Sequence, residues 1–252
     1  MNICPTSIGN LADNLRGAAV AGQQISSWDL SMLPSSITHR EDDLTVTVSS
    51  NTTLGELQKK LASARQWLPI DSLSQISPTI EEIISNNLNG SRRYGYGTIR
   101  EHIIGLTVIL PNGCVVTSGG QVVKNVAGFD LCKLFVGSKG TIGIILEATF
   151  KLQPLPESEE LFSYECRTLS EADEIINSLI YSPITPILLD LHNLKKNGYW
   201  EIVVGFAGMR EDVAWQAATL GSIEKFNRCD WGYPASAIQN IPEIHIVRSV
   251  LP

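Results

Sequence analysis

Glycine recurs at unusual density along residues 119–145, which run GGQVVKNVAGFDLCKLFVGSKGTIGII. The density extends back to residue 90, and these glycines stand at positions 90, 95, 97, 105, 113, 119, 120, 128, 137, 140 and 143. Glycine costs backbone entropy, so clusters occur where a turn, a positive φ or a close approach of backbone to a ligand requires them. Exposed backbone amides also suit an anionic diphosphate. The stretch therefore predicts a phosphate-bearing ligand or tight strand packing, and we expect packing to explain some glycines in either case.

Around this stretch the hydrophobic pattern alternates between helical and strand periods. Thr53 and Glu56 form a capping box, which predicts a helix start. The sequence Pro111-Asn112-Gly113 separates two apolar runs and predicts a hairpin turn. The elements expected up to residue 152 are a helix at 7–21, a strand at 44–49, a helix at about 53–64, a hairpin at 106–117 and a strand at 143–152.

A domain boundary is expected at Pro154 and Pro156, because two prolines in three residues cannot continue a strand ladder. Beyond them the expected order is strand, helix, strand, strand, helix, with Ser170 as the cap of the first helix and Gly221 closing the second. Such an order predicts a small antiparallel sheet with helices on one face. The chain is thus expected to be α+β, with one domain over residues 1–156 and a second, partial one over 157–252.

Composition narrows the function classes. The chain has 252 residues, 43% hydrophobic and 18% charged, with a formal net charge of −7. This is an ordinary globular composition, and its negative charge argues against nucleic-acid binding. No run reaches the ~18 apolar residues of a membrane helix, and no secretory signal stands at the N-terminus, so a cytoplasmic protein is expected. Its five cysteines and four histidines show no metal-ligand spacing, so we expect reduced thiols and no metal site.

Five short runs between residues 79 and 145 carry a resemblance to a known family. They match, in order, the patterns T-I-G-G, N-x-x-G, Y-G-x-x-R-D, K-N-x-A-G-Y-D and G-S-x-G-T-L-G-V-I. The runs here are Thr79-Ile80, Asn87-Leu-Asn-Gly90, Tyr96-Gly-Thr-Ile-Arg100, Lys124-Asn-Val-Ala-Gly-Phe-Asp130 and Gly137-Ser-Lys-Gly-Thr-Ile-Gly-Ile-Ile145. Each is weak alone, but their order makes the signal strong. The chain resembles the FAD-binding PCMH or vanillyl-alcohol-oxidase superfamily, and most closely the FAD-binding subunit of glycolate oxidase.

The resemblance implies a two-lobed FAD-binding PCMH-type domain followed by an antiparallel cap domain, with the flavin diphosphate held largely by backbone amides. It implies oxidation of a small 2-hydroxy acid, beside a second flavin subunit and an iron–sulfur subunit that could keep the protein peripheral to a membrane. No catalytic residue can be named. Carried over by position, the candidate FAD contacts are Pro78, Thr79, Asn87, Gly90, Tyr96, Gly97, Lys124, Gly128, Gly143 and Ile144.

Three departures from the family pattern weaken the expected FAD site. The family has a glycine-rich diphosphate loop before the strand at 44–49, but no glycine occurs between Gly22 and Gly55. The first lobe is also expected to lack its opening strand. Finally, Glu81 and Glu82 stand where the family has two glycines, and carboxylates near a diphosphate repel it.

Two alternatives therefore stay open. One is a degenerate, cofactor-free structural or regulatory subunit of the same fold, and the other, weaker one is an unrelated small-molecule binding module. The pair Arg92-Arg93 predicts either a diphosphate or partner contact or a solvated turn. Lys124 is interpreted as a flavin neighbour only because of its place in its run.

Overall fold

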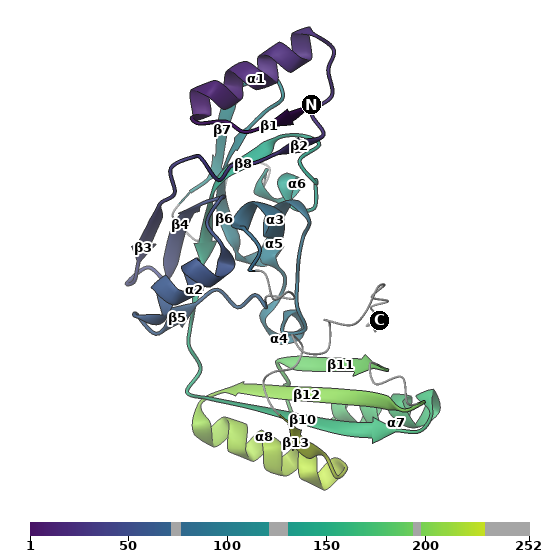
Figure 1. Cartoon of the computed structure of the whole chain (residues 1–252). Helices are drawn as coiled ribbons and strands as arrows, with labels where there is room; N and C mark the ends of the chain where they lie inside the picture. The colour runs from purple at the N-terminus through teal and green to yellow at the C-terminus, as the bar shows by residue number, and fades with distance from the viewer. Residues whose placement is uncertain (72–76, 121–130, 194–197, 230–252) are drawn as a thin grey trace. The chain divides into compact units, whose positions relative to one another are not determined.

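The computed structural model describes residues 1–71, 77–120, 131–193 and 198–229 (Figure 1). Its described residues form two compact units. The first holds residues 1–69, 77–89, 98–120 and 131–155, and the second holds 70–71, 90–97, 156–193 and 198–229. The predicted α+β class is confirmed, whereas the assignment of residues 90–97 to the second unit was not foreseen from the sequence.

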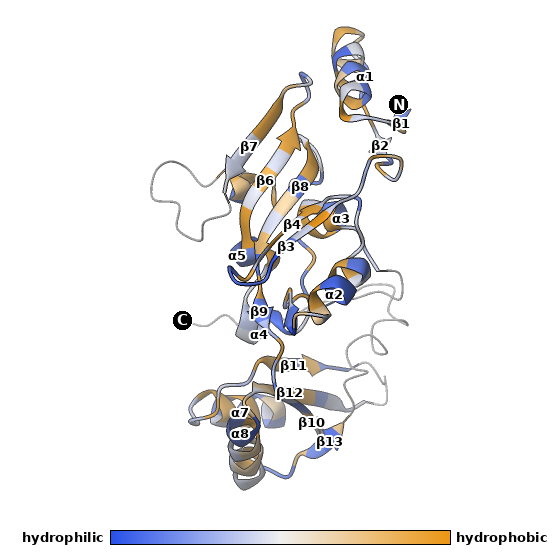
Figure 2. Cartoon of the chain, turned by 90° about the vertical axis from the view of Figure 1, so that its left-hand side faces the viewer, coloured by the Kyte–Doolittle hydropathy of each residue, from blue (hydrophilic) through white to orange (hydrophobic). Residues whose placement is uncertain are grey.

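A five-stranded antiparallel sheet is the centre of the first unit, with strand order β3-β4-β8-β6-β7. The strands are β3 (Ile37–Arg40), β4 (Thr45–Ser49), β6 (Ile103–Ile109), β7 (Val115–Gly119) and β8 (Ile144–Lys151). The hairpin β6–β7 and the strands β4 and β8 confirm the sequence predictions. Central strand β8 buries side chains on both faces, because α3 packs against it and Ile144 and Leu146 lie in the core with α1. Figure 2 shows hydrophobic residues concentrated on α3 and on these strands.

Helix α1 (Ile8–Val20) joins two short parallel strands, β1 (Asn2–Ile3) and β2 (Ser27–Trp28). The expectation that the opening strand is missing was wrong, because β1 pairs with β2 even though it has two residues. Such a short strand has no alternating pattern to reveal it. The Ser7 hydroxyl accepts a hydrogen bond from the Asn10 amide and starts α1. The helix buries Leu11 and Leu15 against one end of the sheet.

Short helices and a two-stranded ladder complete the first unit. They are α2 (Leu54–Ala62), β5 (Gln66–Trp67), α3 (Ile80–Ser85), α5 (Ile99–His102), α6 (Cys132–Phe135) and β9 (Gln153–Pro154), and β5 pairs with β9. The capping box of Thr53 and Glu56 is confirmed at the start of α2. Equivalent boxes start α3 and α5. These helices therefore begin where a hydroxyl and a glutamate three residues later satisfy free backbone amides.

The second unit is an antiparallel sheet of order β11-β12-β10-β13 with two long helices. Its elements are α4 (Arg93–Tyr96), β10 (Ser158–Cys166), α7 (Leu169–Ile180), β11 (Leu188–His192), β12 (Trp200–Gly208), α8 (Arg210–Ile223) and β13 (Asn227–Cys229). From β10 to α8 the predicted order is confirmed. Two details were wrong, since Thr168 rather than Ser170 caps α7, and α8 continues through Gly221. The buried Phe206 lies in the core that α7 and α8 form with the sheet. No described helix is long and apolar enough to cross a membrane.

Candidate functional site

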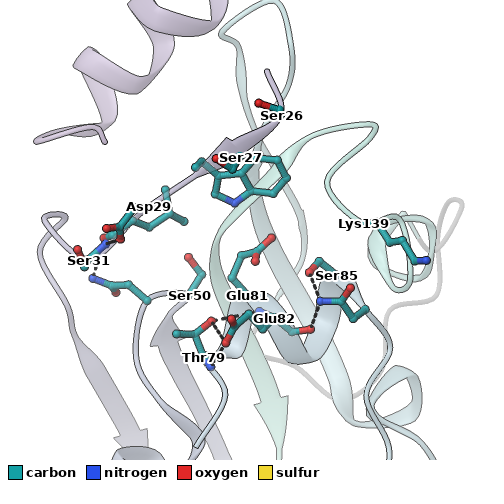
Figure 3. A pocket seen from close by; sticks show the side chains of 14 residues that line it. Ser26, Ser27, Asp29, Ser31, Ser50, Thr79, Glu81, Glu82, Ser85 and Lys139 are labelled. Atoms are coloured by element: carbon teal, nitrogen blue, oxygen red, sulfur yellow. Dashed lines mark hydrogen bonds between the residues drawn. The ribbon is translucent and has the colours of Figure 1, made fainter. Parts of the chain in front are cut away.

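A pocket of about 420 Å³ lies within the first unit. One wall is the end of β2 and the turn after it, residues 26–31. The other wall is α3 with the turn before it, together with Ser50, Asn51 and Lys139 (Figure 3). These walls include the two segments where the sequence is expected to depart from the FAD-binding pattern, at the missing glycine-rich loop and at Glu81 and Glu82. The pocket is therefore the place in this chain to test for a diphosphate site.

The backbone amides at the start of α3 already have partners inside the chain. The Thr79 amide donates to Oε2 of Glu82 at 2.8 Å, and the Glu82 amide donates back to Oγ1 of Thr79 at 3.2 Å. The Ile80 amide donates to the Thr52 carbonyl at 2.9 Å, and the Glu81 amide donates to the Ser50 carbonyl at 2.8 Å. None of these four donors is left for a ligand.

Glu81 is the buried acid of the pocket. The residue is 9% exposed, and its Oε1 has no hydrogen-bond partner among the described residues. Burial raises the pKa of this carboxyl above its usual range, and the neighbouring Glu82 charge raises it further. Ser85 and Trp28 oppose the rise only partly, and neither is a hydrogen-bond partner of Oε1. The loss of hydration is thus the main cause of the raised pKa, and an N–H or O–H donor reaching Oε1 would relieve it.

Trp28 lines one side of the pocket, and its ring leaves no room for a side chain at Gly140. A Cβ added at Gly140 would stand 2.5 Å from Cζ2 of the Trp28 ring, and Gly140 also has a positive φ of 71°. Both the contact and the backbone conformation therefore require glycine. This glycine serves packing and a turn.

The pocket is acidic. Its lining includes Asp29, Glu81 and Glu82 against a single basic residue, Lys139. The pKa of Asp29 is held below its usual range by the amide and the hydroxyl of Ser31, so Asp29 is ionised at neutral pH. The lining repels an anion and attracts a cation.

The ten predicted FAD contacts fall in both units and in one undescribed segment. Thr79 lines the pocket, whereas four others lie in the first unit away from its lining: Pro78, Asn87, Gly143 and Ile144. Gly90, Tyr96 and Gly97 belong to the second unit, and Lys124 and Gly128 lie outside the described residues. Of the predicted contacts that the structure describes in the first unit, Thr79 is the one that lines this pocket.

Packing explains the two predicted contacts at the start of β8. A Cβ at Gly143 would lie 2.9 Å from the Ile109 carbonyl oxygen and 3.2 Å from the Phe135 ring. Ile144 is 3% exposed and lies in the core beneath α1. Asn87 has a left-handed φ of 52°, which a turn after α3 requires. The expectation that packing accounts for some glycines is confirmed at Gly143.

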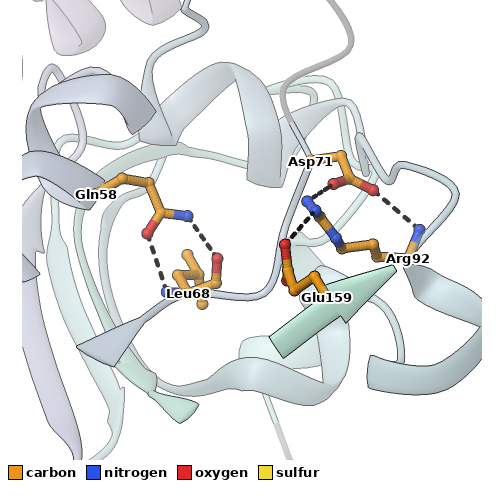
Figure 4. Close-up of polar contacts among 5 residues, drawn as sticks. All are labelled: Gln58, Leu68, Asp71, Arg92 and Glu159. Atoms are coloured by element: carbon orange, nitrogen blue, oxygen red, sulfur yellow. Dashed lines mark hydrogen bonds and ion pairs between the residues drawn. The ribbon is translucent and has the colours of Figure 1, made fainter. Parts of the chain in front are cut away.

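In the second unit, Arg92 forms a buried ion-pair cluster that the sequence did not reveal. Its guanidinium lies 2.6 Å from Oδ1 of Asp71 and 3.5 Å from Oε2 of Glu159, and its amide donates to Oδ2 of Asp71 at 2.9 Å (Figure 4). Gly90 is required there because an added Cβ would clash with the Asp71 side chain. Burial and the Glu159 charge raise the pKa of Tyr96 to about 12, so its phenol is neutral. Arg92 thus lies in an ion-pair cluster and not in a solvated turn.

Sequence reasoning missed Asp71, Glu159 and Trp28. The pairing of Asp71 with Arg92 has no local signal, because the residues are distant in sequence. The capping role of Glu82 did have a local sequence signal. Thr79-Ile-Glu-Glu82 repeats the hydroxyl-x-x-glutamate pattern that predicted the capping box at Thr53.

Comparison with known proteins shows what this chain is similar to. Residues 6–119, a little under half of the chain, match the family model described as "FAD binding domain". This part of the chain is therefore similar to an FAD binding domain.

The individual relatives are larger oxidoreductases. The chain is 36% identical over 150 residues to glycolate oxidase subunit GlcD of Bacillus subtilis, and 32% identical over 143 residues to glycolate oxidase subunit GlcE of Escherichia coli. It is 30% identical over 173 residues to a mitochondrial D-lactate dehydrogenase of Arabidopsis thaliana. These matches cover 60%, 56% and 69% of this chain, but only 32%, 40% and 30% of the relatives.

Solved structures support the fold. An alkyldihydroxyacetonephosphate synthase aligns with a TM-score of 0.76 at 16% identity, covering 95% of this chain and 56% of the synthase. A variant of Phl p 4, a glucose oxidase, aligns with a TM-score of 0.68 at 16% identity, covering 91% of this chain and 51% of the other. At such identities the likeness is one of fold alone.

A diphosphate does not fit the residues at the start of α3. The donors there are bonded within the chain, and the carboxylates of Glu81 and Glu82 line the pocket. An anionic diphosphate would therefore meet acceptors and negative charge where it needs donors.

Proposed function

We propose that the chain is a supporting subunit of an FAD-dependent 2-hydroxy-acid oxidoreductase of the glycolate oxidase type, with weak FAD binding of its own. The FAD binding domain match over residues 6–119 carries this proposal. The glycolate oxidase and D-lactate dehydrogenase relatives support the choice of 2-hydroxy acids as substrates.

In this proposal the chain works beside a second flavin subunit and an iron–sulfur subunit, in the cytoplasm or peripheral to a membrane through its partners. Flavin supplies the two-electron redox chemistry of such complexes, while the protein positions the flavin and tunes it. Residues 1–156 would form the FAD-type domain and residues 157–252 the cap-side domain. Weak FAD binding follows from the bonded amides of α3 and from Glu81 and Glu82.

A second candidate function is a cofactor-free structural subunit of the same complex. The saturation of all four donors at residues 79–82 favours it, because the chain itself supplies the partners that a diphosphate would supply. The family-like glycine runs would then persist for packing, as Gly143 illustrates.

Flavin binding separates these candidates. The purified chain is dialysed against excess FAD, and its spectrum is recorded from roughly 300 to 600 nm, because bound flavin has bands near about 450 nm. Saturable binding approaching one FAD per chain supports the first candidate. A chain that stays colourless at every FAD concentration supports the second. Co-purification with flavin and iron–sulfur subunits tests the complex separately.

A further inference from the structure

The pocket of the first unit presents acceptors rather than donors. Glu81 approaches it from α3, whereas the Asp29 side chain on the opposite wall turns toward Ser31 (Figure 3). Glu82 is bonded back to Thr79, so its carboxylate serves the helix. Glu81 is therefore the carboxylate that a ligand would meet, and Asp29 adds a negative charge at the opposite wall.

Glu81 is an independent sign of a missing partner. Its side chain is directed into the pocket rather than along α3 (Figure 3), the residue is 9% exposed, and Oε1 has no hydrogen-bond partner in the described part of the chain. Buried acceptors without a partner are rare, since each forfeits its hydration without compensation. A ligand carrying an N–H or O–H donor would supply that partner.

The nearby basic residue, Lys139, does not neutralise the negative charge of Glu81. Lys139 is exposed at the rim, its side chain extends away from Glu81 (Figure 3), and its amide donates to the Ser85 carbonyl at 2.8 Å. The pocket thus keeps an excess of negative charge, which favours a cation over a neutral donor. The Trp28 ring adds an aromatic wall, and aromatic faces attract ammonium groups.

We propose that this pocket binds a small organic cation through an alkylammonium group, with Glu81 as the principal acceptor, Asp29 as the opposing charge and Trp28 as the aromatic wall. A volume of about 420 Å³ accommodates a ligand of a few heavy atoms. This site goes beyond the proposed oxidoreductase role. It is decided by amine binding, whereas the oxidoreductase role is decided by flavin absorbance and subunit co-purification, so either can fail alone.

The test is a titration of the full chain with n-propylammonium chloride, beside n-propanol as the neutral isostere and inorganic pyrophosphate as the anion. Heat of binding gives the affinity, and the Trp28 indole resonance, assigned with Trp28→Phe, reports the location. The proposal expects saturable propylammonium binding tighter than about 10 mM, with propanol at least about tenfold weaker and pyrophosphate not binding.

Substitutions locate the acceptor. Glu81→Gln keeps shape and removes charge, and it is expected to weaken propylammonium binding at least about tenfold, which is about 1.4 kcal/mol. Asp29→Asn should weaken it less, because Asp29 is exposed and its charge is screened. The matched control is Glu41→Gln, an exposed acid of the same unit that does not line the pocket, and it should leave the affinity unchanged. Equal affinity for propanol, saturable pyrophosphate binding, no amine binding, or an unaltered affinity in a folded Glu81→Gln variant would each overturn the proposal.

Discussion

Restoring the family's paired glycines should tighten FAD binding while destabilising the chain. The change is Glu81→Gly together with Glu82→Gly. In the structure, Oε2 of Glu82 accepts from the Thr79 amide at 2.8 Å, so the change frees that donor. It also removes the buried carboxylate of Glu81 from the pocket. Both effects favour a diphosphate.

The magnitude follows from charge and hydrogen bonding. Like charges at ~4 Å repel by about 1 kcal/mol in water and about 4 at an effective dielectric near 20. A freed donor to a charged partner contributes about 1.5 kcal/mol or more. Taking the lower figures, FAD binding should improve by about 2.5 kcal/mol, or somewhat under a hundredfold. Loss of the capping box and two added glycines should lower the free energy of unfolding by roughly 2–3 kcal/mol.

The assay is an FAD titration of the double variant and the unaltered chain, paired with denaturant unfolding. Glu56→Gly is the matched control, because it destroys the equivalent capping box of α2 at a site that does not line the pocket. The control should lose stability without any change in FAD affinity. A folded double variant whose FAD affinity equals that of the unaltered chain would refute the assignment of these carboxylates to the diphosphate end.

Three further substitutions test individual contacts. The pKa of Glu81 is raised in the folded chain, so the free energy of unfolding should fall as pH rises above about 4.5, the ordinary pKa of an unfolded glutamate. Glu81→Gln should abolish that fall and should unfold at a higher denaturant concentration at pH 7. A variant whose unfolding follows the same pH profile as the unaltered chain would contradict this. Arg92→Ala removes the ion-pair partner of the buried Asp71, so it should lower the free energy of unfolding by about 3 kcal/mol. A loss below about 1 kcal/mol would show that solvent screens the ion pair. Gly140→Ala forces a Cβ against Trp28 at a positive φ. The free energy of unfolding, measured by thermal denaturation, should therefore fall by more than about 1 kcal/mol, and the Trp28 emission should change. An unchanged thermal unfolding curve would disprove the contact.

Local patterns predicted much of the fold. The Thr53 capping box, the Pro-Asn-Gly hairpin and the apolar periods are short-range signals, and the structure confirms the elements that they predicted. Strand β1 was not predicted from the sequence, because two residues cannot show a strand period. Glycine density predicted close approaches correctly but not their partners, as Gly140 with Trp28 shows.

The candidate site was predictable only in part. Resemblance to the family pattern, which has glycines at positions 81 and 82, predicted an eroded diphosphate region there, and the structure shows that both glutamates line a pocket. It could not show that Glu82 turns back to Thr79, since a side chain's direction depends on competing acceptors nearby. Pairing of Asp71 with Arg92 depends on tertiary packing over a long sequence separation, and no local signal marks it.

Backbone amide spectra of the unaltered chain during an ADP titration test most directly whether the α3 donors are already engaged. With Thr79, Ile80, Glu81 and Glu82 bonded inside the chain, their resonances should not move up to about 1 mM ADP, a concentration at which a built diphosphate site would be filled. Saturable shifts of those four amides would show that the donors are free to hold a diphosphate after all.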